Sequence, residues 1–265
     1  MTDPAYLVDS HDRRFETTVT RALDDRVTLD RTLFYPEGGG QPADRGTITD
    51  GEREWRVHDV QKTDTIYHHL ALLGEDDANN GDGEDTEGEG STPESGTTVS
   101  GEIDWERRYG HMRHHTAQHL LSALLLEEYD AATTGNQLYA DRARIDVGYD
   151  RFEAEDLEAI EARMNDLVGD ARPVESYELD RETAEAELDP ERTRIELLPD
   201  SITEIRIVEI EGYDRTACAG THVSSTEEIG TVTMTGRESR GSGEERLRFA
   251  LDREESIETG GSDRE

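Results

Sequence analysis

The chain contains very little cysteine, lysine or continuous apolar sequence. Cys218 is the single cysteine among 265 residues, so no disulfide bond can form within the chain. Hydrophobic residues make up 32% of the sequence, and they include no uninterrupted run of about 18 that could span a bilayer. No signal peptide opens the sequence. We therefore expect a cytoplasmic protein with no membrane segment.

Positive charge is also scarce, because 64 acidic residues oppose 28 basic ones and give a formal net charge of −36. Lys62 is the single lysine. An acid-rich surface of this kind is typical of proteins in molar salt, where the Debye length falls to about 3 Å and carboxylate repulsion is screened. We expect a halophilic protein; a mesophilic protein with acidic loops is the alternative. Since high salt also screens repulsion from phosphates, net charge does not exclude a nucleic-acid partner.

Residues 1–104 contain short alternating segments rich in β-branched side chains, with polar turns between them and no long helical pattern. Half a dozen such strands predict a small N-terminal β-barrel domain. The predicted strands cover residues 15–22, 26–34, 46–49, 54–60, 65–70 and 97–103.

Three parts of the chain have the composition of loops. Residues 34–42, Phe-Tyr-Pro-Glu-Gly-Gly-Gly-Gln-Pro, contain three consecutive glycines, which indicate either a flexible loop or a close approach of the backbone to a ligand. Residues 74–97 form an acidic, low-complexity insertion that we expect to be disordered, like the tail at 253–265.

Residues 105–252 combine helical and strand patterns and predict a second, α+β domain built as a two-layer sandwich. A long helix is expected to about residue 129, with Leu120, Leu121, Leu124 and Leu125 on its buried side. Further helices are expected at 155–168 and 181–187, and strands at 136–148, 173–179, 205–210, 230–234 and 246–251.

Two pairs of residues in this domain have the spacing of metal ligands. His115 and His119 are four residues apart, so both imidazoles face one side of the helix. Cys218 and His222 are also four apart, with Gly220 between them to permit a tight turn. A three-histidine, one-cysteine set favours Zn²⁺. Either pair alone is common in proteins that bind no metal.

Other polar residues near these pairs are weaker candidates for metal ligands or catalytic groups. We expect His111 to be solvated or to face a substrate, and His114 to be a packing or surface residue. A His-Glu-x-x-His metallopeptidase motif is excluded because residue 116 is threonine. No catalytic carboxylate lies beside the four ligands in the sequence.

The pattern Arg113-x-His115-Thr-Ala-x-His119-Leu-Leu, followed after about 100 residues by Cys218-x-Gly-Thr-His222, resembles the editing domain of alanyl-tRNA synthetase. Phe34-Tyr-Pro-Glu-Gly-Gly-Gly-Gln41 resembles the β-barrel that precedes this domain in free-standing, medium-length alanyl-tRNA editing proteins of the AlaX type. The resemblance covers nearly the whole chain outside the insertion and the tail. Together with the acidic composition, it suggests a haloarchaeal member.

The resemblance implies hydrolysis of the ester in mischarged tRNA(Ala), chiefly the seryl and also the glycyl ester, with one zinc ion held by His115, His119, Cys218 and His222. The sequence contains no ATP-binding motifs of class II synthetases and is too short for a complete synthetase, so we expect no aminoacylation; we also expect no DNA partner and no membrane partner. Thr116 and Gln118 are candidates for positioning the substrate or a water molecule. Residues of the glycine loop are candidates for binding the substrate: Gly38, Gly39, Gly40 and Gln41.

Two other functions remain open at this point. One is editing of a different mischarged tRNA by a threonyl-type enzyme, and the other is a zinc-stabilised RNA-binding module without hydrolytic activity. The sequence indicates neither an oligomeric state nor a docking surface for tRNA. Candidate docking arginines are those near the motifs: Arg107, Arg108, Arg113, Arg237, Arg240 and Arg246.

Overall fold

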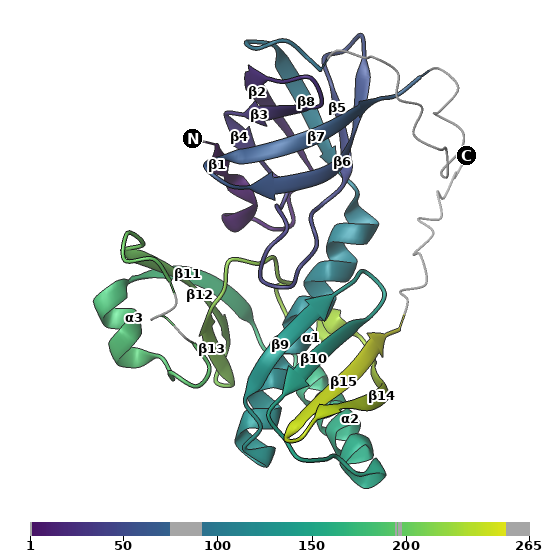
Figure 1. The fold of residues 1–265 in the computed structure, drawn as a ribbon, viewed down its shortest axis with the longest axis vertical. Coiled ribbons are helices and arrows are strands. Elements are labelled where there is room, and N and C mark those ends of the chain that lie inside the picture. The colour runs from purple at the N-terminus through teal and green to yellow at the C-terminus, as the bar shows by residue number, and fades with distance from the viewer. Residues whose placement is uncertain (1, 75–91, 194, 196–197, 253–265) are drawn as a thin grey trace, which may run out of the picture.

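The computed structural model describes residues 2–74, 92–193, 195 and 198–252. Six antiparallel strands of the N-terminal part close into the predicted barrel (Figure 1). In barrel order they are β2 (Arg14–Ala22), β3 (Arg26–Leu29), β7 (Ile66–Leu72), β6 (Glu54–Lys62), β5 (Gly46–Thr49) and β8 (Thr98–Ile103). Beside the barrel lie a short parallel pair, β1 (Asp3–Pro4) and β4 (Arg31–Thr32), and the 3-10 turn η1 (Ala5–Leu7).

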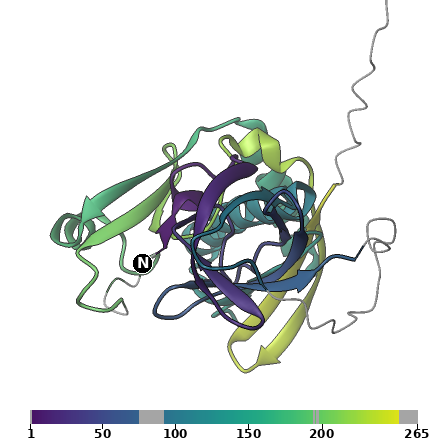
Figure 2. The ribbon, with the colours of Figure 1, turned by 90° about the horizontal axis from the view of Figure 1, so that it is seen from above.

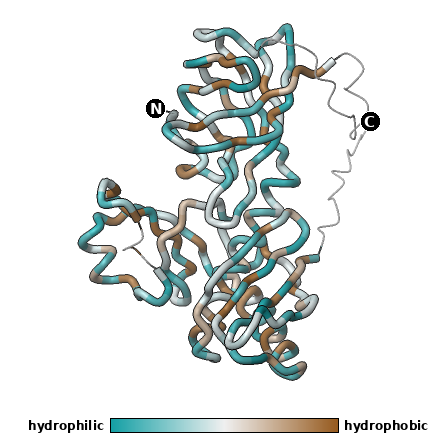
Figure 3. The backbone as a smooth tube through the Cα atoms, viewed as in Figure 1, coloured by the Kyte–Doolittle hydropathy of each residue, from teal (hydrophilic) through white to brown (hydrophobic). Residues whose placement is uncertain are grey.

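The barrel interior is filled by the apolar side chains that alternate along its strands. Val57, Val60 and Trp55 of β6 are fully buried, and Phe15 of β2 packs edge-on against Phe34. Figure 3 shows the same alternation as hydrophobic segments interspersed with hydrophilic ones along the barrel strands. Closure leaves no free sheet edge, which is how a barrel of short strands becomes stable.

The long helix α1 (Trp105–Tyr129) leads from the barrel into the rest of the molecule (Figure 1). Asp104 caps its start by accepting a hydrogen bond from the Arg107 N–H group at 3.1 Å. At its end Asp130 adopts the left-handed conformation that often terminates a helix. The four leucines predicted on its buried side are fully buried, each contributing on the order of 2 kcal/mol of hydrophobic free energy.

A four-stranded antiparallel sheet covers α1, in the order β14 (Val232–Gly241), β15 (Glu244–Leu251), β10 (Ala143–Val147) and β9 (Thr133–Leu138). The helix α2 (Ala154–Gly169) and the 3-10 turn η4 (Thr226–Ile229) complete this layer. One apolar core joins the helices to the sheet, with Phe152, Leu247 and Phe249 among its buried members. This arrangement confirms the predicted α+β class.

A second, three-stranded sheet extends to one side of the molecule (Figures 1 and 2). It contains β11 (Val174–Asp180), β12 (Glu204–Ile210) and β13 (Asp214–Ala217), and the helix α3 (Arg181–Glu187) packs on it around a small core of its own. The sequence did not predict β13, and it predicted a shorter β14. Cys218 directly follows β13, so this sheet determines where the cysteine lies.

A buried ion pair joins the barrel to α1. Arg108 and Asp44 are both fully buried, and Arg108 Nε lies 3.0 and 2.9 Å from the two Asp44 carboxylate oxygens. Arg108 also donates to the carbonyl oxygen of Ser10 at 3.0 Å, and Asp44 accepts from the Tyr35 N–H group at 2.7 Å. The pair thus links Arg108 of α1 to Asp44 and to backbone groups of the N-terminal part, and it holds the barrel against the helix.

The predicted tail at 253–265 and most of the predicted insertion at 74–97 lie outside the described residues. At the end of the insertion, Thr92 Oγ1 donates to the carbonyl oxygen of Leu23 at 2.7 Å, so this part is attached to the barrel. The predicted boundary between residues 104 and 105 falls at the start of α1, and the division into two domains stays a prediction. Within the described ranges, no helix is both long and apolar enough to cross a membrane.

Candidate metal centre

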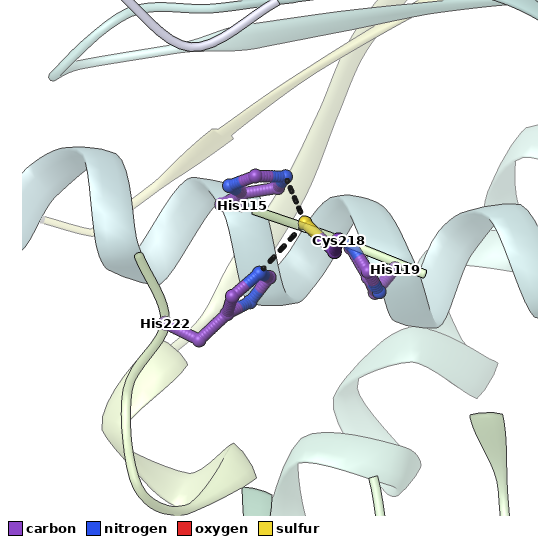
Figure 4. Close-up of side chains that lie close together, drawn as sticks. All are labelled: His115, His119, Cys218 and His222. Atoms are coloured by element: carbon purple, nitrogen blue, oxygen red, sulfur yellow. Dashed lines mark hydrogen bonds between the residues drawn. The ribbon is translucent and has the colours of Figure 1, made fainter. Parts of the chain in front are cut away.

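The four predicted ligands come together on one side of α1 (Figure 4). His115 and His119 project from the helix, and Cys218 and His222 come from the loop that follows β13. One nitrogen or sulfur atom from each residue lies within 4.8 Å of all the others. Cys218 Sγ is 3.6 Å from His115 Nε2 and 3.4 Å from His222 Nε2.

These distances suit a tetrahedral zinc site. With bonds of about 2.0 Å to nitrogen and 2.3 Å to sulfur, the nitrogen–sulfur edge of such a tetrahedron is about 3.5 Å long. The donor set, three imidazoles and one thiolate, is one that zinc favours. The residues present therefore fit a zinc ion.

Each histidine uses its Nδ1 atom for a partner outside the cluster, which leaves Nε2 free to face inward. His115 Nδ1 lies 2.9 Å from Gln41 Oε1, and His119 Nδ1 lies 3.2 Å from Asp214 Oδ2. His222 Nδ1 lies 3.1 Å from Thr116 Oγ1. Such outer partners select the histidine tautomer that binds a metal through Nε2.

Asp214 is a carboxylate beside the cluster that no motif in the sequence indicated. It is buried, and Arg192 donates to its Oδ1 atom from Nε at 3.0 Å and from Nη2 at 2.7 Å. Asp214 comes four residues before Cys218, and this short separation was the one available signal. It contacts His119 on the side facing away from the cluster, so it can hold the His119 ring in the orientation needed to bind a metal.

The charges of the cluster favour the metal-binding form of the cysteine. Burial opposes ionisation of Cys218, but the imidazoles of His115 and His222 outweigh it and hold the pKa of the thiol well below its usual value. Burial likewise opposes protonation of His119, but its bonds to Asp214 and Cys218 outweigh burial and raise the pKa of this imidazole to about 9. Burial and the neighbouring His115 lower the pKa of His222 to about 3.

Gly220 is required by close packing. A Cβ atom at this position would lie 2.1 Å from His115 Cε1 and 3.1 Å from Gln41 Oε1. The φ angle of Gly220 is not positive, so its backbone conformation does not require glycine, contrary to the tight turn expected from the sequence. The absence of a side chain lets the cysteine loop lie against the helix.

A cavity of about 660 Å³ opens beside the cluster, between the barrel and the rest of the molecule. His115, His119 and Cys218 lie in its wall. The barrel contributes Tyr6, Tyr35, Gly38, Gly39 and Lys62, and the other walls include Gln118, Ser122, Asn136, Arg192 and Ala219. The volume is in the range of cavities that hold small ligands.

The predicted substrate contacts occupy different places around this cavity. Gly38 and Gly39 line it, as does Gln118, whose Oε1 atom is buried without a hydrogen-bond partner in the described part of the chain. Gly40 instead lies against β9, where its carbonyl oxygen accepts from the Leu138 N–H group at 2.8 Å. Gln41 and Thr116 are fully buried and are not part of the cavity wall.

The structure corrects two expectations about polar residues of α1. His111 is fully buried and outside the cavity wall, so it is neither solvated nor substrate-facing; burial lowers its pKa to about 3. Arg108 and Arg113 are buried and bind protein groups, so they do not belong to a docking surface. His114 packs against Phe249, with ring centroids 6.0 Å apart, as a packing histidine should.

Two families of known proteins match parts of the chain. Residues 5–106 match the family described as tRNA synthetases class II (A), and residues 205–248 match the second additional domain of threonyl and alanyl tRNA synthetases. The alanyl-tRNA editing protein AlaX-M of Methanosarcina barkeri is 38% identical over 252 residues, which cover 95% of this chain and 99% of that protein. The chain belongs to the alanyl-tRNA editing protein family.

Other relatives are longer than this chain. The alanyl-tRNA editing protein AlaX-L of Pyrococcus horikoshii is 37% identical over 243 residues, covering 88% of this chain and 54% of that protein. An alanine–tRNA ligase of Methanothrix thermoacetophila is 39% identical over 242 residues, covering 90% of this chain and 24% of the ligase. The chain thus corresponds to a part of these larger proteins, and to nearly the whole of the Methanosarcina barkeri protein.

Proposed function

We propose that this protein hydrolyses the ester bond of mischarged tRNA(Ala), chiefly the seryl and also the glycyl ester, as a free-standing editing enzyme. The observation that carries the proposal is the convergence of the four ligands beside the 660 Å³ cavity, whose wall contains three of them, His115, His119 and Cys218. Membership of a family whose members are named for alanyl-tRNA editing supports the substrate class.

In this proposal His115, His119, Cys218 and His222 hold one zinc ion. When bound, the ion supplies positive charge beside the ester. Four protein ligands complete a tetrahedron, so the proposed role of the site is to position the aminoacyl group. An ester is reactive enough for positioning and electrostatic stabilisation to account for its hydrolysis.

Gln118 is the proposed selector of the seryl group. Gln118 lines the cavity, and its Oε1 atom is buried without a hydrogen-bond partner among the described residues; an unpaired buried acceptor costs about 1–3 kcal/mol. The hydroxyl group of a seryl side chain can donate to this atom, whereas the methyl side chain of an alanyl group cannot. A site that hydrogen-bonds a hydroxyl group rejects analogues without it much more strongly than an apolar pocket does.

Thr116 has a different proposed role from the one considered for it above. Its hydroxyl group donates to the Met112 carbonyl oxygen at 3.0 Å and accepts from the Val223 N–H group at 3.3 Å, in addition to its contact with His222. With these partners it orients His222 and the loop behind it. Gly38 and Gly39 keep their proposed role at the substrate cavity.

The proposal is tested by deacylation of purified, zinc-loaded protein against seryl-, glycyl- and alanyl-tRNA(Ala), with seryl-tRNA(Thr) as a fourth substrate. The assay is run from low salt to molar KCl, because carboxylate repulsion must be screened. Loss of the seryl ester from tRNA(Ala) with the alanyl ester retained is the expected result. Preferential loss from tRNA(Thr) supports the threonyl-type alternative, and tRNA binding without any hydrolysis supports the binding module.

A further inference from the structure

Gln41 connects the barrel to the candidate metal centre. Its side chain is fully buried, although it belongs to the loop that follows the three glycines. Its Oε1 atom accepts from His115 Nδ1 at 2.9 Å and from the Thr221 N–H group at 3.2 Å. Its Nε2 atom donates to Thr221 Oγ1 at 2.9 Å. One amide therefore joins the helix that carries two ligands to the loop that carries the other two.

The hydrogen bond to Gln41 determines the tautomer of His115. An amide oxygen can only accept, so His115 Nδ1 must carry the proton and Nε2 must be free. His115 Nε2 is the atom that lies 3.6 Å from Cys218 Sγ. Asp214 and Thr116, the outer partners of His119 and His222, lie outside the barrel. Gln41 belongs to the barrel.

The backbone around Gln41 is packed too closely to move independently. The Gly40 carbonyl oxygen accepts from both the Leu138 N–H group, at 2.8 Å, and Gln137 Nε2, at 3.1 Å. A Cβ atom on Gly40 would lie 2.2 Å from Asn136 Oδ1. The loop is thus held against β9 on one side and against the metal-binding loop on the other.

We propose that Gln41 is a positioning residue of the metal centre, through which docking of the barrel and binding of the metal stabilise each other. The inference rests on the zinc site of the proposed function. If Gln41 holds His115 in its ligand form only when the barrel is docked, then metal binding must favour the docked barrel by the same free energy. The glycine loop then acts on the metal as well as lining the substrate cavity.

The test compares zinc binding by full-length Gln41→Leu and Gln41→Glu variants. Leucine removes all three hydrogen bonds, whereas glutamate keeps the acceptor for His115 and Thr221, whose hydroxyl group can reverse and donate. We expect the zinc dissociation constant to rise about 10–100-fold in Gln41→Leu and to stay within a few-fold of wild type in Gln41→Glu. Gln61→Leu, which changes an exposed glutamine of β6, is the matched control and should bind zinc as wild type does.

Hydrogen exchange measures the coupling without relying on activity. In the wild-type protein, zinc should slow amide exchange in residues 37–44 of the barrel, and in Gln41→Leu this effect should be lost. Wild-type zinc affinity in a folded Gln41→Leu variant, or equal loss in Gln41→Leu and Gln41→Glu, overturns the proposal. If Gln41→Leu does not fold, Gln41→Ala replaces it: weaker zinc binding than in Gln41→Glu supports the inference, and equal binding in the two variants overturns it.

The outcomes for the inference and for the proposed function are separate. Wild-type protein that binds zinc but hydrolyses no ester would contradict the proposed function and leave the role of Gln41 intact. A Gln41→Leu variant that keeps full zinc affinity and loses deacylation would overturn the positioning role and assign Gln41 to the substrate.

Discussion

His119 Nδ1 lies 3.2 Å from Asp214 Oδ2, inside a network in which Arg192 binds the other oxygen of the same carboxylate. This relationship keeps His119 protonated in the metal-free protein, because it raises the pKa of the imidazole to about 9. A zinc ion binds neutral imidazole and must displace that proton at lower pH. The free energy of zinc binding therefore depends on pH through His119.

The pH dependence of zinc binding has a definite sign. Because the pKa of His119 is raised to about 9 while that of the Cys218 thiol is held well below its usual value, the zinc affinity should rise with pH up to about pH 9 and then level off. In Asp214→Asn the plateau should begin at lower pH and lie about 10–100-fold lower in affinity. Competition with a chelator from pH 6.5 upward measures both effects. A flat profile in the wild-type protein would contradict this prediction.

Cys218→Ala should remove both the metal and the activity. The substitution deletes the thiolate ligand, so we expect zinc content below half of one ion per chain and deacylation reduced by about 100-fold or more. Elemental analysis and the seryl-tRNA(Ala) assay are made on the same preparation. Ser239→Ala, on the exposed end of β14, is the control for handling. Full zinc content with full activity would rule out the four-ligand site.

Much of this site follows from spacing in the sequence. Ligands four residues apart on a helix must share a face, and a cysteine four residues from a histidine can meet them from a loop, so the quartet was predictable. The barrel was predictable as well, because its strands alternate between buried and exposed side chains. These features depend on local geometry, which short segments of sequence specify.

The outer partners of the ligands were not predictable in the same way. Gln41 meets His115 across 74 residues of sequence, and Asp214 meets His119 across 95. Such contacts depend on how the barrel loop and β13 pack against α1. The periodicity of apolar residues in the sequence does not predict that packing. The burial of His111 was missed for a related reason: its helical position predicts a face, but its complete burial depends on how the rest of the molecule packs on α1.

Gly40→Ala should disturb the junction more than Gly39→Ala. Both glycines have positive φ angles, +84° and +58°, so either substitution strains the backbone. A Cβ atom at Gly40 would also collide with Asn136 Oδ1, at 2.2 Å, whereas a Cβ atom at Gly39 would have no atom of another described residue within 4 Å apart from its chain neighbours. We expect Gly39→Ala to cost about 1 kcal/mol of stability and Gly40→Ala clearly more. Urea unfolding of both variants measures the difference, and equal losses would show that the collision is relieved.

Asp44→Ala should be strongly destabilising. It leaves the fully buried Arg108 guanidinium without its carboxylate, and breaking such a pair costs about 3–5 kcal/mol. The exposed pair of Arg142 and Asp141, with an N–O distance of 3.0 Å, provides the control. Asp141→Ala should change the free energy of unfolding by less than about 1 kcal/mol. Similar values for the two variants in denaturant unfolding would contradict the assigned role of the buried pair.

Lys62 should contribute to tRNA binding and little to hydrolysis itself. This exposed side chain lines the cavity, and its ammonium group forms no ion pair within the described ranges, while Arg192 in the same wall is bound to Asp214. The ammonium group of Lys62 at this position can contact a phosphate near the 3′ end of the tRNA. Lys62→Ala should raise KM about 3- to 10-fold at unchanged kcat and reduce the salt dependence of binding by about one counterion. Lys62→Arg should keep both values, and Arg21→Ala, on the barrel away from the cavity, should leave them unaltered. A fall in kcat with unchanged KM would instead place Lys62 at the reacting ester.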